Sequence, residues 1–105
     1  MRQPIEMLGT THPSILTATW TKLTTLPGGQ ENNGRTALLI VNENTTVTFR
    51  IETGCLTAPT TATAGIPLAP GGIYQEDIDN ITNGYVYAYQ TSGGTLASLA
   101  VKEGI

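Results

Sequence analysis

One acidic stretch of the sequence, EDIDN at Glu76–Asn80, carries the side chains that could hold a metal ion. Carboxylate and amide oxygens are the ligands that Ca²⁺ prefers in proteins. The stretch lacks the spacing of an EF-hand loop, and no second source of oxygen ligands accompanies it. We therefore expect a solvated acidic turn here in preference to a metal site.

Three tyrosines, Tyr85, Tyr87 and Tyr89, recur at every second position and so share one face of a strand. A tyrosine combines a large rigid ring with a polar tip, so such a face could stack on sugar rings or anchor a protein interface. The same pattern is typical of half-buried tyrosines that line a sheet with their hydroxyls at its rim, which is the interpretation we favour. We keep the three as candidate partner-binding residues.

No catalytic group can be assembled from the remaining residues. His12 is the only histidine and Cys55 the only cysteine. Neither stands in a nucleophile–base–acid order, a phosphate-binding loop or a metal-ligand pattern. A lone cysteine also excludes an intrachain disulfide, and we expect a buried thiol. The sequence predicts a protein that is not an enzyme and carries no cofactor.

The composition of the chain argues against two classes of partner, nucleic acids and membranes. The 105 residues suit one domain, and only 12% of them are charged, about half of the usual share of roughly 25%. The net charge of -3 and the scattered lysines and arginines leave no basic patch, so we expect no binding to nucleic acid. The longest apolar run, Ala37–Val41, is far below the ~20 residues needed to cross a bilayer. Without a signal-peptide pattern, we expect synthesis in a reducing cytosol and no membrane association.

The stretch Arg35–Glu52 predicts the element around which the chain folds. Ala37–Val41 is apolar on both sides, which favours a central strand with both faces covered. An Asn-rich segment follows, and then strict alternation places three residues on one inward face: Val47, Phe49 and Ile51. Two strands joined by a short polar turn predict a β-hairpin.

Further strand patterns recur along the chain, separated by Gly-rich and Pro-rich turns. They lie at Ile15–Lys22, Ile73–Ile78, Tyr85–Gln90 and Leu96–Lys102. Because no helical period appears, we predict an all-β fold: a single antiparallel β-sandwich, or a jelly-roll-like barrel, of about 6–8 short strands. We expect an extended N-terminal arm at residues 1–13 and a β-sandwich domain at 14–105.

The N-terminal arm carries apolar side chains that no core pattern explains: Ile5, Met7 and Leu8. Apolar residues in a polar tail suggest a buried destination, so we assign these three as candidate partner-binding residues. The alternative is a frayed tail. The Gly-rich and Asn-rich loop Leu26–Gly34 is a second candidate for attachment.

Four segments together resemble a known family. They are RTALLIVN at Arg35–Asn42, GIPLAPGG at Gly65–Gly72, GYVYA at Gly84–Ala88, and LAVKE at Leu99–Glu103. In this order the pattern resembles small all-β virion accessory proteins of tailed bacteriophages, which include capsid decoration (cement) proteins and related head and tail proteins. The resemblance covers about two-thirds of the chain, from Arg35 to Glu103.

The resemblance implies a structural virion protein that decorates and stabilises a bacteriophage capsid as an oligomer, with a trimer favoured. Its partner would be the major capsid protein or another virion protein, its place the virion after synthesis in the host cytoplasm, and no cofactor would be needed. An alternative stays open: a tail- or fibre-associated module that binds host-surface carbohydrate, or a tail adaptor protein.

Overall fold

The computed structural model describes residues 7–26, 28, 34–77, 80–91 and 97–105. These residues form strands and connecting loops, and the part of the chain that is described contains no helix. The strands are β1 (Ser14–Ile15), β2 (Thr21–Lys22), β3 (Ala37–Val41), β4 (Phe49–Cys55), β5 (Ile66–Leu68), β6 (Ile73–Glu76), β7 (Tyr85–Gln90), β8 (Ala97–Ser98) and β9 (Ala100–Gly104). The predicted all-β class is confirmed.

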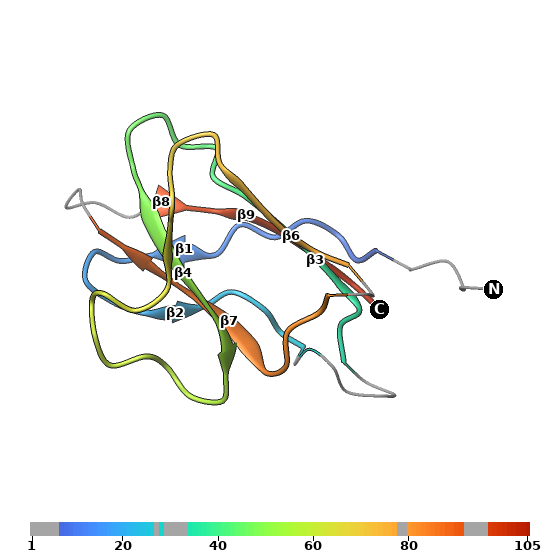
Figure 1. Ribbon diagram of the computed structural model, residues 1–105. Coiled ribbons are helices and arrows are strands. Elements are labelled where there is room, and N and C mark those ends of the chain that lie inside the picture. The colour runs from blue at the N-terminus through green and yellow to red at the C-terminus, as the bar shows by residue number, and fades with distance from the viewer. Residues whose placement is uncertain (1–6, 27, 29–33, 78–79, 92–96) are drawn as a thin grey trace.

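Two antiparallel sheets make up most of the molecule. A four-stranded sheet has the order β2-β7-β4-β5, and a three-stranded sheet has the order β6-β3-β9. A short pair, β1-β8, lies beside them. In Figure 1, β3, β6 and β9 run together as one group and β4 and β7 as another. The arrangement is sandwich-like, as predicted.

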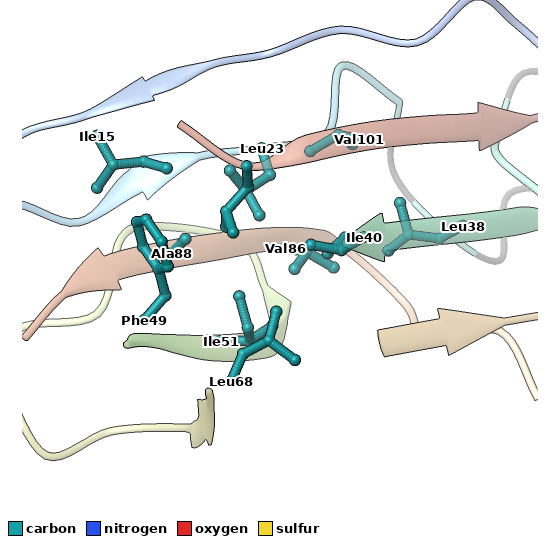
Figure 2. Packing of buried hydrophobic residues seen from close by; sticks show 11 residues of the cluster. Ile15, Leu23, Leu38, Ile40, Phe49, Ile51, Leu68, Val86, Ala88 and Val101 are labelled. Carbon is teal, nitrogen blue, oxygen red and sulfur yellow. The ribbon is translucent and has the colours of Figure 1, made fainter. Parts of the chain in front are cut away.

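The buried core lies between the two sheets (Figure 2). The alternation seen in the sequence decides which side chains enter it: Leu38 and Ile40 from β3, Phe49 and Ile51 from β4, and Val86 and Ala88 from β7. Val47 packs against the same cluster from outside the strand, so the predicted inward face of Val47, Phe49 and Ile51 is confirmed.

The predicted hairpin is wrong. β3 pairs with β6 and β9, whereas β4 pairs with β5 and β7, so the two strands belong to different sheets. The reason lies in Asn42, whose side chain is fully buried. Its Nδ2 donates to the carbonyl oxygens of Val47 (2.8 Å) and Leu68 (3.0 Å), and its Oδ1 accepts from the backbone N–H of Asn44 (3.1 Å). The Asn-rich segment therefore anchors a crossing between sheets.

The predicted strand Ile15–Lys22 is also broken. Ala18 has a φ of +59°, a left-handed conformation that L-residues rarely adopt and that cannot continue a strand. The chain instead leaves β1, which pairs with β8, and enters β2, which pairs with β7. This turn brings Trp20 to the edge of the four-stranded sheet.

Pro70 and Gly71 form a tight turn. Gly71 has a φ of +79°, and the N–H of Gly72 donates to the carbonyl of Ala69 at 2.8 Å. Proline at the second position and a left-handed glycine at the third are the signature of a type II turn. This turn joins β5 of one sheet to β6 of the other.

Candidate functional site

The outer surface of the four-stranded sheet presents an aromatic face. Tyr85, Tyr87 and Tyr89 on β7 are half-buried, while the residues between them are buried in the core. The structure therefore brings the three predicted tyrosines together on the face of β7 that points away from the core. We use "aromatic face" for these three tyrosines together with Trp20.

Trp20 completes this face, although the sequence pattern did not assign it there. Its ring centroid lies 5.1 Å from that of Tyr89, with the planes at 44°. Its indole N–H donates to the carbonyl of Thr61 at 3.0 Å. Both contacts fix the ring, so Trp20 is part of a preorganised surface. The pairing of β2 with β7, which brings it there, leaves no local signal in the sequence.

Charged side chains frame the aromatic face. The Lys22 ammonium lies 4.2 Å from the centre of the Tyr85 ring, a cation–π contact. Lys22 and Glu52 stand opposite Tyr87 from the two neighbouring strands. Tyr87 is thus at the centre of the face, flanked by one positive and one negative side chain.

Arg50 holds the loop between β4 and β5 beside the aromatic face. Its guanidinium donates to three successive backbone carbonyls, those of Thr63 (3.2 Å), Ala64 (2.8 Å) and Gly65 (2.7 Å). Arg50 also stands opposite Tyr89 across the sheet. The loop is therefore held at the edge of the face from two points, Arg50 and Trp20.

The described part of the N-terminal arm lies elsewhere. Met7 and Thr11 form bridges to Gly104 and Val101 of β9, and the N–H of Leu8 donates to the carbonyl of Glu103 at 2.8 Å. The side chains of Met7 and Leu8 stay 40% and 37% exposed. Ile5 lies outside the described residues. Met7 and Leu8 thus lie beside the three-stranded sheet, whereas the tyrosines lie on the other sheet.

The acidic stretch proves to contribute to a buried ion pair. Glu76 accepts a hydrogen bond from Nη2 of Arg35 at 2.9 Å, and both side chains are almost fully buried. The hydroxyls of Thr82 (2.6 Å) and Tyr74 donate to the other carboxylate oxygen. Asp77 is exposed, and its backbone N–H donates to Oδ1 of Asn80 at 2.7 Å. Residues 78–79 lie outside the described part.

The sequence did not single out this pair, because nothing local marks a charge as buried. Arg35 precedes β3 and Glu76 ends β6, and only the pairing of these strands brings them together. Nη1 of Arg35 also donates to the carbonyls of Gly84 (2.8 Å) and Leu26 (3.2 Å). The pair therefore connects the three-stranded sheet to the start of β7 and to the loop after β2.

The environment of Glu76 makes the stability of the fold depend on pH. Burial raises the pKa of Glu76, but hydrogen bonds from Thr82, Tyr74 and Arg35 and the positive charge of Arg35 outweigh it, so the pKa lies below its ordinary value of 4.5. A carboxyl with a lowered folded-state pKa stabilises the fold above its unfolded pKa, and this stabilisation is lost as pH falls through the folded value.

We therefore expect the free energy of unfolding to fall as the pH drops below about 4.5, the ordinary pKa of a glutamate. Chemical denaturation from neutral pH into the acid range measures this. Glu76→Gln should flatten the acid limb, whereas Asp77→Asn, at an exposed residue, should leave it in place. An unchanged acid limb in Glu76→Gln would refute the assignment.

The other groups that could do chemistry stand apart from one another. His12 is exposed, and its Nε2 lies 3.7 Å from the carboxylate of Glu43. Cys55 is a free, buried thiol, as predicted, and burial followed by the negative charge of Glu52 raises its pKa. Among the described residues, no three His, Cys, Asp or Glu side chains gather into a group that could hold a metal ion.

Comparison of the chain with known protein families, curated proteins and solved structures found no match. In the described part of the chain, no helix is long and apolar enough to span a membrane. The functional proposal therefore depends on the surfaces of the molecule and on the resemblance in its strand motifs.

Proposed function

We propose that this chain is a structural protein of a bacteriophage virion, made in the host cytoplasm, that decorates and stabilises the capsid shell. The observation that carries the proposal is the aromatic face, a rigid surface of Trp20, Tyr85, Tyr87 and Tyr89. Tryptophan and tyrosine are the residues that most often anchor protein interfaces, because they bring much contact area at little cost in side-chain entropy.

The construction of the face fits a binding role better than a catalytic one. Three of its four rings are held by specific contacts: Trp20 by the hydrogen bond to Thr61, Tyr89 by the contact with Trp20, and Tyr85 by the contact with Lys22. Binding to such a surface orders few new side chains, which lowers the entropic cost of association. The proposed partner is the major capsid protein or another virion protein. Many copies on one shell would add avidity, and trimers are the oligomer that the resemblance favours.

Co-sedimentation with purified capsids tests the proposal. We expect Tyr87→Ser to weaken shell binding by about tenfold or more, because the residue is the central anchor of the face. Ile105→Ser is the matched control, since it removes an exposed apolar side chain outside the face. Thermal unfolding should first establish that both variants are folded. Full occupancy of the shell by Tyr87→Ser would exclude the aromatic face as the attachment surface.

Carbohydrate is the second candidate ligand, because Trp and Tyr rings also offer flat apolar surfaces on which sugar rings can stack. In that case the chain would be a tail- or fibre-associated module that binds the host surface. A glycan array separates the two functions. Retention on glycans that is lost in Tyr87→Ser, without co-sedimentation with capsids, would favour the carbohydrate function.

A further inference from the structure

The outer surface of the three-stranded sheet forms a second candidate site, an apolar groove of about 200 Å³. Leu39 and Val41 of β3 and Ala100 of β9 line its floor. His12 and Glu43 stand at one end, and Lys102 stands at the other. The groove lies on the outward side of β3, opposite the core residues Leu38 and Ile40.

This outer surface is more apolar than a solvent-facing sheet requires. Antiparallel sheets with one solvated face usually alternate apolar and polar residues, but β3 is apolar on both faces. The core covers the inner face, whereas Leu39 and Val41 remain half-buried. Ile73 on β6 stands beside Val41 and is 62% exposed, so the apolar strip extends across β6, β3 and β9. Such a strip marks a contact surface.

The order of charges along the strip points to a particular occupant. Lys102 stands opposite Leu39, while Glu43 lies two residues beyond Val41 at the other end. A two-fold axis that lies in the contact plane and runs across the strands reverses the strand direction between two copies. This operation places Lys102 of one copy at the end where the other carries Glu43. The surface is thus complementary to itself, as an isologous contact requires.

We propose that the groove is the contact between two copies of this chain, which pack with their three-stranded sheets face to face. Leu39, Val41 and Ile73 form the apolar centre of the contact, and the Lys102–Glu43 pairs close its two ends. Sheets packed in this way lie about 10 Å apart, which long side chains such as lysine and glutamate can bridge together. The contact leaves the aromatic face, on the other sheet, free for its own partner.

This two-fold contact does not depend on the proposed virion function, and it differs from the three-fold association that the resemblance favours. The mass of the assembly in solution therefore distinguishes a dimer from a trimer. Sedimentation equilibrium of the full chain over a range of concentrations should show a monomer–dimer equilibrium. If the chain failed to co-sediment with capsids, the dimerisation measured by sedimentation equilibrium would be unaffected.

Charge reversal gives the specific test. Glu43→Lys and Lys102→Glu should each weaken dimerisation by about tenfold, because each converts two symmetry-related attractions into repulsions. The double variant restores opposite charges and should recover most of the affinity. Asp77→Lys, a charge reversal at an exposed residue outside the lining of the groove, is the control and should dimerise like the original chain. A chain that stays monomeric, forms only trimers, or dimerises equally well in both single variants would overturn the proposal.

Discussion

Arg35→Met is expected to destabilise the fold by about 3–5 kcal/mol, the usual cost of removing one partner of a buried ion pair. The Arg35 side chain has no exposed surface, and Glu76 is 2% exposed. The variant leaves the Glu76 carboxylate in the interior without its cation, and it also removes the donors to the carbonyls of Gly84 and Leu26. Chemical denaturation at neutral pH measures the loss.

A paired variant separates charge from packing in this prediction. Arg35→Met combined with Glu76→Gln removes both charges, so it should be less destabilised than the sum of the two single variants. The coupling between them should exceed about 0.5 kcal/mol, as for residues in direct contact. Additive effects would mean that the pair contributes nothing beyond the packing of its side chains. Arg50→Met, at an arginine that binds only loop carbonyls, is the matched control.

Phe49→Ala is expected to cost about 3–5 kcal/mol, because the ring is fully buried and its removal leaves a cavity in the core. Phe49 packs where the two sheets meet, and β5 and β7 flank it on either side. Thr48→Ala, one residue earlier, should cost little, since Thr48 accepts hydrogen bonds from Thr91 only through its backbone carbonyl.

Equilibrium unfolding in denaturant of these two variants gives the check. The midpoint of Phe49→Ala should fall well below that of the original chain, while Thr48→Ala should stay close to it. Similar losses in both would contradict the assignment of Phe49 to the shared core of the two sheets.

The faces of the strands could be predicted from the sequence, because alternation is a local property. Phe49 and Ile51 point inward, and the tyrosines of β7 lie on the opposite face from Val86 and Ala88, as the spacing indicates. Such alternation decides the burial of a side chain once the strand has a covered face. The all-β class follows from the same signal, repeated along the chain.

The pairing of the strands could not be predicted, because it depends on contacts between distant residues. The segment after β3 has the composition of a hairpin turn, yet Asn42 uses its amide to bind Val47 and Leu68 inside the fold. Whether a polar side chain acts as a turn residue or as a buried anchor depends on partners that local sequence does not show. The Arg35–Glu76 pair, 41 residues apart, escaped prediction for the same reason.

Only part of the aromatic face could be predicted from the sequence. The stripe of tyrosines is visible in the sequence, but Trp20 reaches it only through the left-handed Ala18 and the pairing of β2 with β7. Conversely, Met7 and Leu8 look like residues of a free arm, whereas their backbone lies along β9. Deleting this segment would also uncover an edge of the three-stranded sheet, so substitutions on the aromatic face test attachment more cleanly than truncation.

The most direct test of the virion proposal is a density map of capsids with this chain bound. We predict that the aromatic face, with Tyr87 near its centre, lies against the shell, and that Leu39 and Val41 lie away from the shell. Bound chains that touch the shell through another surface would contradict the assignment of the aromatic face. Capsids that carry no density for the chain at saturating concentration would contradict the proposed function itself.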